Sequence, residues 1–190
     1  IPVTFTLQID QITSVDQQAE NFGIVANSKM AFHDPAFAFN PDTCRCDLKR
    51  FRSQRAINAY LAENDINIFP ELLFFNQQAG RTTQELILEI TASGSVSYFE
   101  RFAATLQAPD FNFRQFPFDT QQFYVRVQSL FERDFFTLAP DTMNSGFGVQ
   151  LGEEEWIFTN DEFTAEVIDY KGRDQIAFGF TTHRHLNFYV

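Results

Sequence analysis

Carboxylates and histidines that stand close together in this sequence are the first places where a metal ion could bind. Glu153, Glu154 and Glu155 are consecutive, and carboxylate oxygens are the ligands that calcium prefers. His183 and His185 occupy alternate positions of one predicted strand, so their imidazoles share a face and a metal site there is conceivable. A run of acidic residues is more often plain surface charge, so calcium is one of two interpretations of the triplet.

Cys44 and Cys46 are the 2 cysteines of the chain, and one residue separates them. Two free thiols and one strained bridge are both compatible with this spacing, because disulfides prefer defined Cα and Cβ separations. The sequence also lacks the HExxH, GxSxG and glycine-rich phosphate motifs of common enzyme classes. We therefore expect no enzyme activity and no required cofactor, with calcium as the one cofactor that the acidic triplet suggests.

The composition predicts one globular unit that is rich in strands. The chain has 190 residues, of which 44% are hydrophobic and 16% aromatic, with 25 phenylalanines. Aromatic side chains favour strands, and this length suits a single domain covering residues 1–190. The net charge of −11 argues against nucleic-acid binding, which needs an excess of lysine and arginine. No stretch is long and apolar enough to cross a bilayer, and the first residue is not methionine, so we expect a piece of a longer chain.

Alternating apolar and polar residues predict strands along most of the chain. The pattern is clearest from Val3 to Ile9, and strand-like runs follow at 22–32, 85–91, 95–106, 122–128, 156–170 and 176–189. Ser53 can cap the one helix that we expect, and the polar stretch 140–150 should be a mobile loop. The predicted fold is an all-β, immunoglobulin-like Greek-key β-sandwich of about ten strands with one short helix.

The segment from Pro109 to Phe123 reads PDFNFRQFPFDTQQF, and it resembles the signature loop of the Cys-loop receptor superfamily. The specific part is FPFD with Gln121 close behind it. Pro109 and Phe123 stand where animal receptors have cysteines, and the missing disulfide is similar to the bacterial branch of the family. Further matches follow the family's order: SVDQQAE at 14–20, IFPELLFFN at 68–76, SGSVSYFERF at 93–102 and HRHLNFYV at 183–190.

This resemblance implies the extracellular ligand-binding domain of a bacterial pentameric ligand-gated ion channel. Such a domain would assemble as a homopentamer, face the periplasm from the inner membrane and bind a small ligand or ion at subunit interfaces. Its own transmembrane domain would begin just after Val190. A soluble secreted pentameric binding protein without a pore is the alternative, and the sequence beyond Val190 would distinguish the two.

The resemblance also implies which residues bind the agonist between neighbouring subunits. The implied residues are Phe69, Glu71, Phe131 and Tyr170 on one subunit, and Tyr98 and Arg101 on the facing subunit. Aromatic rings beside carboxylates suit an amine through cation–π contact, whereas Arg101 suits a carboxylate. The sequence leaves the choice between an amine and a carboxylate open.

The signature loop would couple ligand binding to the pore. Pro117 stands between two phenylalanines, which is a good place for a cis peptide bond. A guanidinium best stabilises a carboxylate at a domain border, so we expect Asp16, Asp119 and Arg184 to form an ion-pair cluster. Glu20 matches a carboxylate tied to proton gating in a bacterial relative, and half-burial would raise the pKa of such an acid. Protons and calcium are therefore candidate triggers beside small organic ligands.

Overall fold

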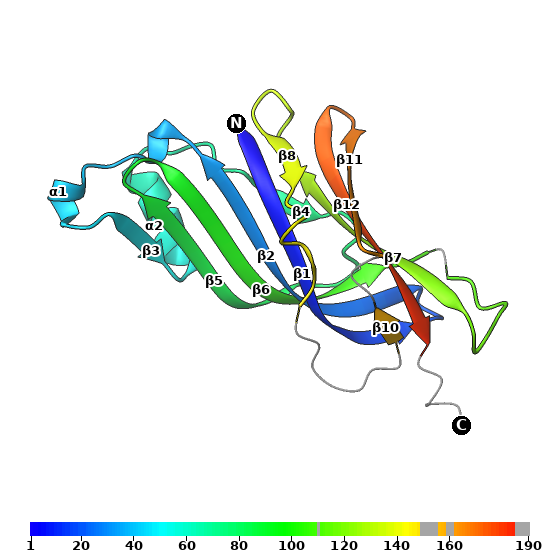
Figure 1. Cartoon of the computed structure of the whole chain (residues 1–190). Helices are drawn as coiled ribbons and strands as arrows, with labels where there is room; N and C mark the ends of the chain where they lie inside the picture. The colour runs from blue at the N-terminus through cyan, green and yellow to red at the C-terminus, as the bar shows by residue number, and fades with distance from the viewer. Residues whose placement is uncertain (110, 149–155, 159–161, 185–190) are drawn as a thin grey trace.

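A computed structural model describes residues 1–109, 111–148, 156–158 and 162–184. Two β-sheets pack together in this part of the chain, which confirms the predicted all-β sandwich (Figure 1). The larger sheet has the order β3 (Leu48–Phe51), β5 (Thr82–Thr91), β6 (Ser95–Gln107), β2 (Asn21–His33), β1 (Pro2–Asp16) and β8 (Thr137–Pro140), with β9 (Gly146–Phe147) paired to β1. The smaller sheet has the order β10 (Trp156–Phe158), β12 (Arg173–Arg184), β7 (Thr120–Ser129) and β4 (Leu72–Phe74), with β11 (Thr164–Tyr170) paired to β12.

The core lies between the two sheets and follows directly from the alternation in the strands. Alternate residues of β1 from Val3 to Ile9 are at most 4% exposed, as the period of two predicts. Phenylalanines of both sheets meet there: the ring centroids of Phe22 on β2 and Phe123 on β7 lie 4.6 Å apart. The ring of Phe180 on β12 stacks on Phe123 at 5.6 Å. These aromatic contacts join the sheets into one continuous core.

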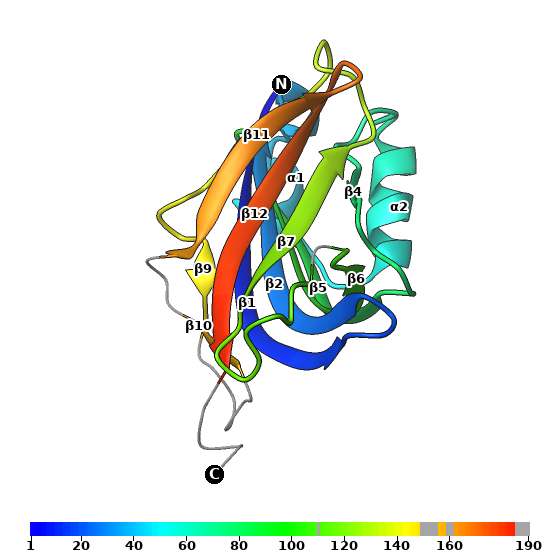
Figure 2. The same ribbon diagram turned by 90° about the vertical axis from the view of Figure 1, so that its right-hand side faces the viewer.

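The predicted helix is α2 (Gln54–Glu63), which lies at the right-hand edge of the view in Figure 2. The ring centroid of its Tyr60 lies 4.9 Å from that of Phe51 on β3. Ser53 caps the helix as expected, because its Oγ accepts a hydrogen bond from the backbone N–H of Ala56 at 3.2 Å. Ile57 and Tyr60 are buried and Leu61 is half-buried, so these residues form the apolar face of the helix. Within the described ranges, no helix has the length and apolar character needed to span a membrane.

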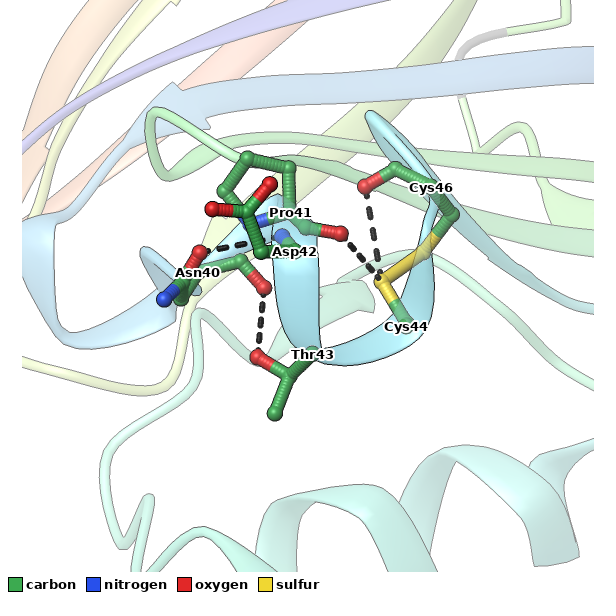
Figure 3. Close-up of a disulfide and its surroundings, with 6 residues drawn as sticks. All are labelled: Asn40, Pro41, Asp42, Thr43, Cys44 and Cys46. Atoms are coloured by element: carbon green, nitrogen blue, oxygen red, sulfur yellow. Dashed lines mark hydrogen bonds between the residues drawn. A yellow bond between two sulfur atoms is a disulfide. The ribbon is translucent and has the colours of Figure 1, made fainter.

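Two helical turns precede β3, and neither is among the predicted elements: η1 (Pro35–Phe37) and α1 (Pro41–Cys44). The side chain of Asn40 caps α1 by accepting a hydrogen bond from the N–H of Asp42 at 3.0 Å. Cys44 and Cys46 form a disulfide across Arg45, whose left-handed φ of 53° turns the chain back (Figure 3). The sequence left open whether the two cysteines are free thiols or a disulfide, and the structure contains the disulfide.

The segment after β8 is more regular than the predicted mobile loop in its described part, 140–148. Asp141 accepts hydrogen bonds from the side chains of Asn144 at 2.8 Å and Thr6 at 3.3 Å. The hydrogen bond from Asn144 lowers the pKa of the Asp141 carboxyl. The turn leads into β9, which pairs in parallel with β1. The predicted run 156–170 is likewise divided into β10 and β11, and residues 159–161 lie outside the described ranges.

Candidate functional site

Asp119 and Arg184 form a buried ion pair at one end of the smaller sheet. Asp119 directly precedes β7, and Arg184 is the last residue of β12. The two strands are antiparallel with Thr120 opposite His183, so the next residues outward come together although they are far apart in sequence. Arg184 Nε donates to Asp119 Oδ1 at 2.7 Å, and the two side chains are 3% and 1% exposed. The predicted pairing of these residues is therefore present.

Polar and aromatic groups enclose this pair. Gln121 Nε2 donates to the second oxygen of Asp119 at 2.7 Å and to the carbonyl of Asn112 at 2.8 Å, which ties the pair to the signature loop. The guanidinium carbon of Arg184 lies 4.4 Å from the ring centroid of Trp156 and 4.9 Å from that of Phe116. Such contacts stabilise a cation that has little access to water.

The loop that follows Asn112 presents apolar side chains to the outside. The Phe116–Pro117 peptide bond is cis, as the sequence predicts. Phe116 is 54% exposed and Phe118 is 71% exposed, although phenylalanine is normally an interior residue. The ring of Phe116 thus lies against the buried ion pair, and Phe118 is exposed two residues further along the same loop. Exposed rings of this kind are typical of a surface that contacts an apolar partner.

Asp16 and Glu20 occupy the turn between β1 and β2, where both are exposed. The Oδ1 atom of Asp16 accepts the backbone N–H groups of Gln18 and Ala19, each at 2.9 Å, and so caps the turn. Among the described residues, no ion pair links Asp16 to Arg184 or to any other cation. Of the predicted cluster of Asp16, Asp119 and Arg184, the described residues therefore contain only the pair of Asp119 and Arg184. Glu20 is exposed in the single chain, so the expected half-burial of its side chain is wrong there.

Three of the predicted ligand-binding residues line one cavity inside the chain. The cavity has a volume of about 290 Å³ and lies between α2, β2, β6 and the segment around β4. Phe69, Glu71 and Tyr98 all contribute to its wall. The ring of Phe69 contacts that of Tyr98 edge-on, with 6.1 Å between the centroids. The family resemblance implies a position between subunits, whereas these residues converge within one chain.

A buried ion pair neutralises one side of this cavity. Glu100 is only 4% exposed, and its Oε1 accepts from Thr83 Oγ1 at 2.6 Å and lies 3.3 Å from Arg81 Nε. Burial raises the pKa of Tyr98 to about 12, and the neighbouring Glu100 adds to the rise while Arg81 opposes it. Sequence reasoning missed Arg81. The available signal was Glu100, a carboxylate on the inward face of an alternating strand, which requires a cation nearby.

Arg101 does not belong to this cavity, although it is close to Tyr98 in sequence. Successive residues of a strand point to opposite faces, so Arg101 projects away from the side that carries Tyr98 and Glu100. There its guanidinium forms an ion pair with Asp10 and donates to Asn27 Oδ1 at 3.0 Å. Within one chain Tyr98 and Arg101 therefore lie on opposite faces of β6, and the predicted site between subunits stays a prediction.

Phe131 and Tyr170 lie apart from the cavity as well. Phe131 packs edge-on against the buried Phe136 at 5.3 Å, in the loop between β7 and β8. Tyr170 ends β11, and its ring meets the half-exposed Phe75 edge-on at 5.0 Å. The second and third loops of the predicted agonist site therefore contribute to other surfaces of this chain.

The possible metal sites have little support in the described ranges. The candidate calcium ligands Glu153, Glu154 and Glu155 lie outside them, as does His185. Within them, no group of at least 3 histidine, cysteine or acidic side chains is arranged to hold a metal ion. His183 instead lies 3.3 Å from a carboxylate oxygen of Glu162, beside the buried Asp119 and Arg184 pair.

The sandwich, its signature loop and the buried pair define an extracellular domain of the kind that the sequence resembles. A family model described as the neurotransmitter-gated ion-channel ligand binding domain matches residues 1–145, and the chain belongs to this family. A proton-gated ion channel of Gloeobacter violaceus is 30% identical over 135 residues, which cover 70% of this chain and 34% of that protein. The chain thus spans about a third of the length of this relative.

Proposed function

We propose that this chain is the ligand-sensing extracellular domain of a pentameric ligand-gated ion channel, and that Asp119 and Arg184 couple it to the pore. One observation carries the proposal: Phe118, which directly precedes Asp119 of the buried ion pair, is 71% exposed. An apolar tip of this kind needs an apolar partner, and the membrane-spanning part of a channel would supply it. Membership of the channel family supports the same function.

A continuous set of strands connects the ligand cavity with this pair. Leu72 and Phe74 on β4 line the cavity, and they pair with Ser129 and Val127 on β7. The other end of β7 begins next to Asp119. A ligand shifts a conformational equilibrium towards the state that it binds more tightly. A ligand that binds one conformation of the cavity wall more tightly would therefore also favour one conformation of the signature loop.

The cavity favours a small amine over a carboxylate. Glu100 neutralises Arg81, whereas Glu71 has no ion-pair partner among the described residues. The aromatic rings of Phe69 and Tyr98 can add cation–π contacts to an ammonium group. The volume of about 290 Å³ is at the lower limit for drug-sized ligands, so the amine must be small.

Electrical recording from the full-length protein tests this function. Small primary amines should evoke a current, and Glu71→Gln should raise the half-maximal concentration about tenfold by removing the carboxylate. Glu63→Gln, at the exposed end of α2, is the matched control and should leave the response unchanged. If amines, protons and calcium all fail to evoke current, the channel function is refuted. Currents that do not depend on Glu71 refute the amine site alone.

Protons are a second candidate trigger, since the relative from Gloeobacter violaceus is a proton-gated ion channel. In this chain His183 links β12 to its surroundings: Nδ1 lies 3.1 Å from Thr120 Oγ1, and Nε2 lies 3.3 Å from Glu162. These contacts place the imidazole between a hydroxyl and a carboxylate on the exposed face of β12. Proton gating through this contact predicts that His183→Gln shifts the pH of half-activation, and an unchanged pH response contradicts it.

A further inference from the structure

A second cavity lies on the other side of β7 from the core, and none of the predicted ligand-binding residues lines it. It has a volume of about 170 Å³. Three segments form its wall: β7, the residues after β4 and the end of β6 with the residues that follow. Gln122, Tyr124 and Arg126 alternate along β7 and therefore project from the same face of the strand.

Arg126 differs from most arginines of the described chain because it has no carboxylate partner there. Those with an ion pair within 4.0 Å are Arg50, Arg52, Arg81, Arg101, Arg133 and Arg184. Arg126 is half-buried, and no acidic residue lines its cavity. Among the described residues its guanidinium contacts the ring of Tyr124, 5.3 Å from the ring centroid, and no carboxylate, in a protein whose net charge is −11. An anion from solution can satisfy it without displacing an internal partner.

Hydrogen bonds between the three segments hold the cavity open in advance. Asn76 Nδ2 donates to the carbonyls of Gln107 at 3.1 Å and Tyr124 at 2.8 Å. Asn76 Oδ1 accepts the backbone N–H of Arg126 at 3.0 Å, and the N–H of Phe75 donates to the carbonyl of Arg126 at 2.7 Å. A ligand therefore finds a formed site, which lowers the entropic cost of binding.

We propose that this cavity binds a small monocarboxylate. The planar fork of Arg126 matches a carboxylate, and the side-chain amide of Gln122 offers a further donor. The rings of Phe75 and Tyr124 suit a short aliphatic chain, which a fully oxygenated anion such as sulfate lacks. A volume of about 170 Å³ is below that of drug-sized pockets, so the ligand has only a few carbon atoms. Phe75 also contacts Tyr170 at the end of β11, with 5.0 Å between the ring centroids.

Binding to the full-length protein that contains this chain tests the site without any channel current. The probe is 3,3,3-trifluoropropionate, whose fluorine NMR line broadens on binding. Arg126→Gln should raise its Kd at least about tenfold, because hydrogen bonds to a charged group are lost. Arg126→Lys should have a smaller effect, since lysine keeps the charge without the fork. Arg55→Gln, an exposed residue on α2, is the control and should leave the Kd unchanged.

A second variant covers the case in which Arg126→Gln does not fold. Gln122→Trp places a large ring at the exposed edge of the cavity and should also abolish binding. Unchanged binding in both variants overturns the proposal. So does loss of binding in Arg81→Gln alone, because the probe then occupies the cavity around Tyr98. Equal competition by sulfate overturns the assignment to a carboxylate. None of these results depends on whether amines or protons open a channel.

Discussion

Replacing Asp119 by leucine tests the energetic role of the buried ion pair most directly. The substitution keeps a side chain of similar size but removes the carboxylate that accepts a hydrogen bond from the guanidinium of Arg184, which is 3% exposed. Removing one partner of a buried pair costs about 3–5 kcal/mol. The free energy of unfolding should fall by this amount, which is a large part of the total for a typical domain. The melting temperature should fall by about 10 °C in a chain of this size.

The full test is a double-mutant cycle with Asp119→Leu, Arg184→Met and the double variant. Arg184→Met should cost at least as much as Asp119→Leu, because it also removes the cation–π contact with Trp156 at 4.4 Å. Replacing both partners by apolar residues is often close to neutral, so the double variant should recover most of the loss. The expected coupling energy is therefore about 3 kcal/mol.

Urea unfolding followed by tryptophan fluorescence measures these values, because Trp156 is the 1 tryptophan of the chain and lies against Arg184. Gln128→Leu, which disrupts a buried side-chain hydrogen bond elsewhere on β7, provides a control outside the cycle. Single variants that each cost less than about 1 kcal/mol would refute the reasoning, as would a double variant whose loss equals the sum of the single losses.

Three further changes should have defined outcomes. Burial raises the pKa of Tyr98 from 10.0 to about 12, so the unfolded chain loses this proton first and stability falls as the pH rises from 10.0 to about 12. Ultraviolet titration should show one tyrosine ionising near the upper value, and Tyr98→Phe should abolish that step. Ser53→Ala should destabilise the protein by about 1 kcal/mol through loss of the helix cap, measured by urea unfolding against Ser95→Ala as a comparison in a strand. Reduction of the Cys44–Cys46 disulfide should lower the free energy of unfolding by only about 1–2 kcal/mol, because the loop that it closes is so short. Urea unfolding with and without dithiothreitol measures this difference, and a reduced protein that does not fold contradicts the prediction.

Local patterns in the sequence were sufficient for the long strands and the helix, whereas the short strands β3, β4, β8 and β9 are not among the predicted runs. Alternation over Val3 to Ile9 predicts a half-buried strand because the period of two follows from backbone geometry alone. Ser53 predicts the start of α2 for a similarly local reason, since its hydroxyl caps a backbone group three residues on. The same period of two places Tyr98 and Arg101 on opposite faces of β6, so their separation also lay within reach of the sequence.

The partners of charged groups depended on the tertiary structure. Asp119 and Arg184 were expected to pair from the family resemblance, but their burial and their distance from Asp16 follow from the register of β7 and β12. The link between Arg81 and Glu100 likewise depends on how β5 pairs with β6. Register between distant strands is a property of the whole sheet, and no local pattern encodes it.

The sequence draws attention first to carboxylates and histidines, whereas the charged sites in the structure are built around arginines. The sequence by itself determined an all-β sandwich with a cis-proline loop, because strand alternation and turn residues act locally. Only the tertiary structure decided which guanidinium groups are neutralised and which one, Arg126, lines a cavity without a carboxylate among the described residues. The physical reason is that charge compensation acts through space, between segments that the fold brings together.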